Sequence, residues 1–282
     1  MLVRSLLMVL AATGGTVNAA AATKILVPLY EWSEDCWPEL QAAAANNPTA
    51  SYLSIINPNS GPILDTSDPS LYCIPVLRQR IPNLTLIGYV RTGYYSRPAS
   101  EVEADVAIYQ SWSGLNVSAG GVKGTSKVDG IFFDETPNFV DSLNGLTTYS
   151  GYAKAARSAF GAKTSTVVFN PGTYANSRLY TFADLVVAYE DSYQNYAAAK
   201  PPPANVASKS AIMIHTFPSA SRVLQISLRR LLGTYGAVYI ATNDIAQEDV
   251  YKRFGDNWND FVKYVAALQK SSTTKARRAL RL

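Results

Sequence analysis

The sequence predicts a single (β/α)8 barrel of the TIM type, in which eight parallel strands alternate with helices. Eight apolar segments of strand length recur along the chain, and segments of helical composition lie between them. Continuous apolar strands separated by helices indicate a parallel sheet that is covered by helices. Eight such units in about 250 residues favour a closed barrel. A doubly wound open sheet is the alternative, because periodicity does not show closure.

Each element follows from these two patterns. The predicted strands are rich in β-branched and aromatic residues and cover residues 25–30, 52–57, 84–90, 130–134, 166–170, 185–190, 211–216 and 237–242. The predicted helices cover residues 38–46, 70–80, 99–111, 149–160, 219–232 and 256–269. Lys200 and the three prolines after it interrupt residues 197–209, which predicts an extended loop after the sixth strand.

The N-terminus has the features of a secretory signal peptide over residues 1–19. Arg4 precedes an apolar run at 6–12, and small residues at 17–19 resemble a cleavage site. The run is shorter than the roughly 20 residues that a membrane-spanning helix needs. We therefore expect a secreted protein, extracellular or wall-associated, with a barrel domain over residues 24–270. Residues 271–282 are expected to form a basic, disordered tail.

Cysteines and glycosylation sequons agree with that destination. Cys36 and Cys73 both lie in the mature chain, and an oxidising compartment predicts a disulfide between them, with two free thiols as the alternative. Sequons at Asn83 and Asn116 predict glycosylation if they lie at the surface.

The positive net charge comes from the ends of the chain. The sequence has 25 Lys and Arg against 21 Asp and Glu. Without Arg4, Lys275, Arg277, Arg278 and Arg281, 20 basic residues remain against the same 21 acidic ones. A nearly neutral body without a basic stripe argues against nucleic acid as a partner.

Polar and aromatic residues follow the ends of the predicted strands. In a parallel barrel these ends converge on one rim, whatever their separation in sequence. The residues expected there are Tyr30, Glu31, Trp32, Asn57, Tyr89, Tyr94, Asp134, Glu135, Asn170, Tyr189, Glu190, His215 and Asp244. Aromatic rings cover the apolar faces of sugars, amides and carboxylates bind hydroxyl groups, and two carboxylates can divide the work of glycoside cleavage. The combination therefore favours a carbohydrate ligand.

Other chemistries lack their usual motifs. His215 is the only histidine, and no G-x-S-x-G segment supplies a serine nucleophile for a triad. No H-E-x-x-H motif or closely spaced histidine pair is present, so we expect neither a metal nor a cofactor. A lyase or aldolase would favour a lysine on a barrel strand, and the predicted strands contain none.

Several segments resemble the spherulin-4-like proteins of fungi and slime moulds, whose hydrolase members are secreted or surface-anchored glycoside hydrolases. The resemblance covers nearly the whole mature chain. It is carried by ILVPLY at 25–30, INPNSGP at 56–62, GYV at 88–90 with Tyr94, DGIFFDE at 129–135 and NPG at 170–172.

This resemblance implies a barrel that cleaves α-1,4-linked N-acetylgalactosamine within galactosaminogalactan, an amino-sugar exopolysaccharide. The acids proposed for catalysis in the family fall here on Asp134, Glu135 and Glu190. We expect Asp134 as nucleophile and Glu190 as general acid/base, with Glu135 as the rival for either role. The chain is expected to act as a monomer. The alternative is a noncatalytic polysaccharide-binding or spore-associated protein that uses the same rim.

Overall fold

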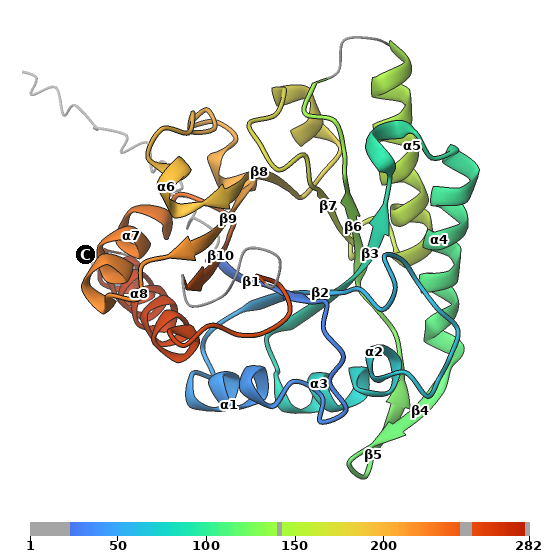
Figure 1. Ribbon diagram of the computed structural model, residues 1–282, viewed down its shortest axis with the longest axis horizontal. Coiled ribbons are helices and arrows are strands. Elements are labelled where there is room, and N and C mark those ends of the chain that lie inside the picture. Colours follow the sequence, from blue (N-terminus) through green and yellow to red (C-terminus); the bar gives the residue numbers. More distant parts are fainter. Residues whose placement is uncertain (1–22, 140–142, 243–249, 280–282) are drawn as a thin grey trace, which may run out of the picture.

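The structure is a closed barrel of eight parallel strands surrounded by helices, which confirms the predicted fold (Figure 1). It is a computed structural model that describes residues 23–139, 143–242 and 250–279. Around the barrel the strands follow the order β1-β10-β9-β8-β7-β6-β3-β2. Barrel strands that follow one another in the sequence therefore lie side by side, and two further strands form a separate hairpin outside the barrel. The predicted signal peptide, residues 1–19, lies outside the described residues.

The barrel strands begin and end close to the predicted positions. They are β1 (Lys24–Leu29), β2 (Tyr52–Ile56), β3 (Leu84–Arg91), β6 (Gly130–Asp134), β7 (Thr166–Phe169), β8 (Leu185–Ser192), β9 (Ser210–Phe217) and β10 (Ala237–Thr242). The helices are α1 (Pro38–Asn46), α2 (Pro69–Tyr72), α3 (Ile74–Arg80), α4 (Ala99–Ser111), α5 (Leu143–Phe160), α6 (Tyr193–Tyr196), α7 (Ser221–Leu231) and α8 (Trp258–Ala279). Short 3-10 turns, among them η3 (Ser177–Thr181), join some of them.

The core has two layers, because successive residues of a strand point to opposite faces. Inside the barrel lies a cluster that includes Leu53, Ile87, Phe132 and Met213. The alternate residues of the same strands pack outward against the helices in a larger cluster that includes Phe133. Apolar side chains thus fill the barrel interior, and the polar residues predicted to bind a ligand lie at its carboxyl end.

Three segments differ from the sequence-based expectations. The helix predicted at 70–80 is split into α2 and α3, because Pro75 has no N–H to continue the helical ladder and the carbonyl of Leu71 accepts from Ser126 Oγ at 3.1 Å instead. A hairpin of β4 (Asn116–Ala119) and β5 (Val122–Thr125) turns at Gly120 and Gly121, whose positive φ angles suit a tight turn.

The third difference is at the C-terminus. Helix α8 continues to Ala279, so residues 271–279 are helical rather than the disordered tail expected from their charge. Residues 275–279 are Lys, Arg and Ala, which are strong helix formers, and the Ser and Thr residues at 271–274 continue a helix that tertiary packing has already nucleated. Among the described helices, none is both long and apolar enough to cross a membrane.

A disulfide joins Cys36 to Cys73, as predicted, across 37 residues and with 5.1 Å between the Cα atoms. It ties the segment before α1 to the junction of α2 and α3. The sequon residues Asn83 and Asn116 are both exposed, which the glycosylation prediction requires.

Candidate active site at the carboxyl end of the barrel

The strand-end residues on β3, β6, β7 and β8 converge on one rim, and the pleat decides which of them face inward. Asp134 lies two residues beyond the interior Phe132, so the two side chains point the same way. On β8 the register against β9 shifts between Val187 and Tyr189. This irregularity places Glu190 opposite the interior residue Met213.

Asn170 joins the two inward carboxylates. Its Nδ2 donates to Oδ1 of Asp134 at 2.7 Å and to Oε2 of Glu190 at 2.6 Å. These two oxygens are therefore separated by no more than about 5.3 Å, the sum of the two distances. The orientation of the amide is set by its Oδ1, which accepts from the backbone N–H of Gly172 at 2.9 Å. One turn after β7 thus holds the acids from β6 and β8 together.

Tyrosine hydroxyls complete the hydrogen bonds of both acids. Tyr89 donates to Oδ2 of Asp134 at 2.6 Å, and Tyr251 donates a short hydrogen bond to Oε1 of Glu190. The ring of Tyr30 packs edge-on against both tyrosines, with centroids 5.6 Å away in each case. The acids therefore rest on an aromatic floor that limits their contact with water.

This environment changes the proton affinity of Asp134. Burial, and then the charge of nearby Glu190, raises the pKa of Asp134 to about 6, although hydrogen bonds from Tyr89 and Asn170 oppose the shift. Asp134 therefore retains its proton up to about pH 6, in the mildly acidic range. A site in which one carboxyl group is protonated beside a second carboxylate can supply one acid and one base.

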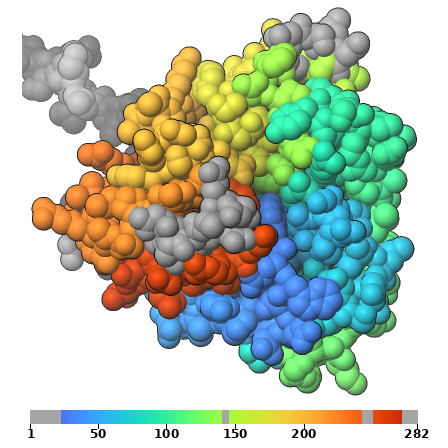
Figure 2. All heavy atoms as spheres, viewed as in Figure 1, coloured from blue at the N-terminus to red at the C-terminus, as the bar shows by residue number. Residues whose placement is uncertain are grey.

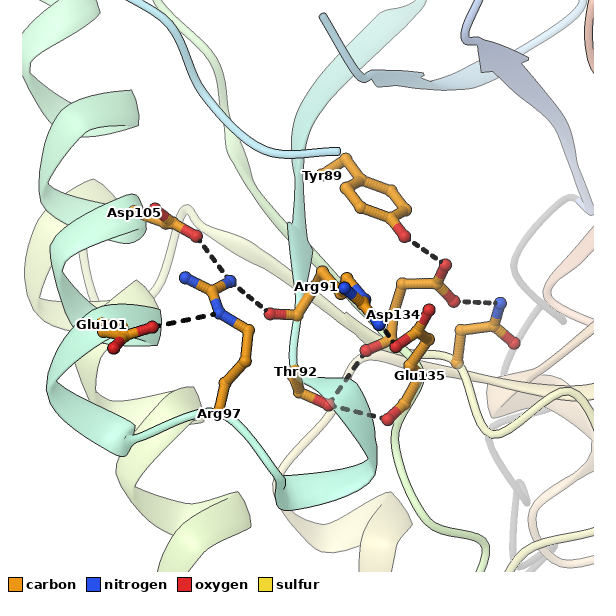
Figure 3. Close-up of polar contacts among 9 residues, drawn as sticks. Tyr89, Arg91, Thr92, Arg97, Glu101, Asp105, Asp134 and Glu135 are labelled. Carbon is orange, nitrogen blue, oxygen red and sulfur yellow. Dashed lines mark hydrogen bonds and ion pairs between the residues drawn. The ribbon is translucent and has the colours of Figure 1, made fainter. Parts of the chain in front are cut away.

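Glu135 takes a different direction from its neighbour Asp134. Strand β6 ends between them, and Glu135 has a left-handed backbone with φ of 53°. Its carboxylate pairs with Nε of Arg91 at 2.7 Å, while Oγ1 of Thr92 donates to the carbonyl oxygens of Asp134 and Glu135 (Figure 3). Glu135 is therefore at the rim but neutralised by a cation, unlike Asp134.

The other predicted rim residues have mixed outcomes. Trp32 and Tyr94 are 63% and 64% exposed, so both rings are accessible to a ligand. Glu31 is half-buried, and burial raises its pKa. Asn57 accepts from the backbone of Gly61 at 3.2 Å and so shapes its own loop.

Two further predicted residues have polar partners outside the carboxylate pair, and a third lies outside the described residues. Tyr189 packs in the outer core and its hydroxyl donates to the carbonyl of Ser192 at 2.6 Å, because the register shift in β8 turns Glu190 inward instead. Nδ1 of His215 lies 2.8 Å from Oγ1 of Thr216, and its Nε2 lies 3.9 Å from Asp191. Asp244 lies outside the described residues.

Sequence reasoning missed Tyr251. It follows the end of β10 by nine residues, so a rule based on strand ends cannot find it. Aromatic contacts with Tyr30 and Tyr239 hold its ring, with centroids 5.6 and 5.7 Å away. Across the described residues, no cluster of His, Cys, Asp and Glu could hold a metal ion.

Comparison with known proteins agrees with this architecture. A profile of spherulation-specific family 4 (Spherulin4) matches residues 24–265. The chain belongs to this family. A second member, Spherulin-4 of Physarum polycephalum, is 29% identical to this chain over 181 residues. These residues are 64% of this chain and 48% of Spherulin-4. The chain therefore spans only about half of that curated relative.

Among solved structures, Sph3 of Aspergillus clavatus, in complex with GalNAc, is similar to this family 4 chain over nearly its whole length. The two are 27% identical with a TM-score of 0.75, and the match covers 88% of this chain and 99% of Sph3. The barrel is thus shared with a sugar-binding protein.

Proposed function

We propose that this protein is a secreted glycoside hydrolase that cleaves α-1,4-linked N-acetylgalactosamine and galactosamine polysaccharide within the chain, with galactosaminogalactan as its substrate. The observation that carries the proposal is the carboxylate pair of Asp134 and Glu190, bridged by Asn170. The likeness to Sph3, which was solved with GalNAc bound, supports the sugar. The predicted signal peptide supports secretion.

The separation of the pair favours retention of anomeric configuration. Retaining enzymes have carboxyl groups roughly 5 to 5.5 Å apart, whereas inverting enzymes leave about 6.5 to 9.5 Å for a water molecule. The limit of about 5.3 Å between the bridged oxygens agrees with the first class. In this mechanism one carboxylate attacks the anomeric carbon while the other protonates the leaving oxygen. The second group then takes a proton from the water that hydrolyses the glycosyl-enzyme.

Within the pair, we propose Asp134 as nucleophile and Glu190 as general acid/base. Donors hold both oxygens of each acid, and Asp134 has the shorter side chain with fewer rotatable bonds, which suits a fixed attacking group. The raised pKa of Asp134 favours the opposite assignment, in which Asp134 supplies the proton. Substrates with an activated leaving group distinguish the two, because they restore turnover to the variant that lacks the acid and not to the one that lacks the nucleophile.

Purified galactosaminogalactan, incubated with the protein and followed by mass spectrometry, tests the function. We expect internal cleavage, seen as a ladder of oligosaccharides, and loss of that ladder in Glu190→Gln. Polysaccharide that binds to the wild type but yields no oligosaccharides would show a noncatalytic binding protein instead.

A further inference from the structure

A hollow lies on the same rim as the carboxylate pair. It has a volume of about 360 Å³ and is lined by Asn138, Phe139, Tyr174, Asn176 and Ser177. The segment after β6 and the segment after β7 form its walls, and these segments lie side by side in Figure 2. A backbone hydrogen bond of 2.9 Å from Asn176 to the carbonyl of Asn138 holds the two walls together. We refer to these five residues as the distal cleft.

Short stretches of backbone connect both walls of the distal cleft to the proposed active site. Asn138 follows Asp134 by four residues, and Tyr174 follows Asn170 by four. A fully extended chain advances at most about 3.6 Å per residue, so Asn138 lies within about 14 Å of Asp134, and Tyr174 lies within about 14 Å of Asn170. A few sugar units cover that distance, so the two places are close enough for one polysaccharide chain.

The chemistry of the cleft suits a sugar ring. Phe139 is 56% exposed, one of the few large apolar side chains that face solvent in the described part of the chain. Tyr174 offers a second ring, and amides of Asn138 and Asn176 stand beside them. Oδ1 of Asn176 accepts from the backbone N–H of Arg178 at 3.0 Å, which fixes that amide. Rings for the apolar sugar face and amides for polar substituents are typical of a carbohydrate subsite.

A positive charge lies against one ring of the cleft. Nζ of Lys200 is 4.7 Å from the centroid of the Tyr174 ring, a cation–π arrangement, although Lys200 itself lines a neighbouring hollow. A free ammonium group on a deacetylated sugar would meet a like charge there. A neutral N-acetyl group carries no charge and would not be repelled by Lys200.

We infer that the distal cleft is a substrate subsite for an N-acetylated sugar unit, with Phe139 and Tyr174 as its platform and Lys200 as the residue that disfavours deacetylated units. The inference rests on the proposed function for its ligand. It also goes beyond that function, because it assigns specificity to residues outside the carboxylate pair.

Binding measurements in the Glu190→Gln protein test the subsite without turnover. The probes are α-1,4-linked N-acetylgalactosamine oligosaccharides of graded length and their fully deacetylated counterparts, titrated by calorimetry. Phe139→Ala and Tyr174→Ala should each weaken binding of the longest acetylated oligosaccharide by about fivefold and that of the shortest by much less, since an aromatic contact of this kind is worth about 1 kcal/mol. Lys200→Gln should narrow the preference for acetylated over deacetylated oligosaccharides by about threefold.

Ile226→Ala is the matched control, because Ile226 is 46% exposed on α7 and is not part of the cleft. Equal weakening of all lengths by Phe139→Ala and Tyr174→Ala, or weakening no greater than in Ile226→Ala, would overturn the subsite. A Lys200→Gln protein with the wild-type preference would overturn the role of Lys200. If the wild type yields no oligosaccharides while length-dependent binding still requires Phe139 and Tyr174, hydrolysis fails and the subsite stands.

Discussion

The two ends of the barrel treat their carboxylates in opposite ways. At the amino ends of β6 and β8, Asp129 pairs with Arg78 at 3.0 Å and Asp184 pairs with Arg157 at 2.8 Å. Each also accepts a backbone N–H, from Leu86 and Val167 respectively. Cations and backbone donors compensate these acids, which is what a stabilising role requires.

At the carboxyl ends of the same two strands, Asp134 and Glu190 accept hydrogen bonds from neutral donors, the side chains of tyrosine and asparagine. They also lie close to each other, so that burial and like charge raise the pKa of Asp134. The acids at the carboxyl ends therefore lower the stability of the fold, and the paired acids at the amino ends raise it. This division is common in barrels with an active site at the carboxyl face.

Substituting the acids at both ends gives the largest contrast. Asp134→Asn and Glu190→Gln should each lower kcat/KM on galactosaminogalactan by about 10² to 10⁴, because each removes a group that acts on the reacting bond. Asp129→Asn and Asp184→Asn should leave kcat/KM within about twofold, since both ion pairs lie at the opposite end of the barrel from the proposed reacting groups. Product release over time, with folding checked by circular dichroism, measures both. Near-wild-type turnover in the Asp134 and Glu190 variants would rule out the pair.

The pH dependence of turnover should report the shared proton. Because burial and Glu190 raise the pKa of Asp134 to about 6, the singly protonated pair is lost above that pH. We expect kcat/KM to fall about tenfold per pH unit above roughly pH 6. A profile that stays flat to pH 8 would contradict the coupling.

The stability of the protein should reveal the same contrast. The folded pKa of Asp134 lies above its ordinary value of 3.8, so the folded state binds the proton more tightly. Its contribution therefore favours folding at low pH and is lost as the pH rises from about 4 to about 6. Asp134→Asn should stabilise the protein by about 1 to 3 kcal/mol at pH 8 and by little at pH 4.

Urea unfolding of the wild type and the variant at both pH values measures this difference. Asp129→Asn serves as the control from the opposite end, and it should lower the stability at pH 8 by up to about 1 kcal/mol, because it loses an ion pair with Arg78. If Asp134→Asn raises the free energy of unfolding equally at the two pH values, packing and not charge causes the increase.

The smallest effect is expected at Tyr251. Tyr251→Phe keeps the ring contacts with Tyr30 and Tyr239 but removes the hydroxyl that donates to Glu190. We expect kcat to fall about tenfold with little change in KM, because the hydroxyl holds Glu190 in place. Tyr180→Phe, which removes a hydroxyl hydrogen-bonded to Ser210 in the outer core, should leave kcat unchanged.

Much of the architecture was predictable because it depends on local patterns. The eight strands, the barrel, the Cys36–Cys73 disulfide and the convergence of Asp134, Asn170 and Glu190 on one rim follow from apolar runs, compartment and strand direction. The expectation for Tyr189 failed because a strand pattern assumes strict alternation, and the shift against β9 interrupts it.

The sequence by itself determined which residues reach the carboxyl ends of the strands, because strand periodicity is set by the backbone and by nearest neighbours. Tertiary structure decided which of them are in contact. Asn170 bridges acids 36 and 20 residues away, and Tyr251 reaches Glu190 across 61 residues. Such partners depend on the register of neighbouring strands and on loop placement, which no local pattern encodes. The adjacent acids show this clearly: Asp134 meets a second acid, and Glu135 meets Arg91.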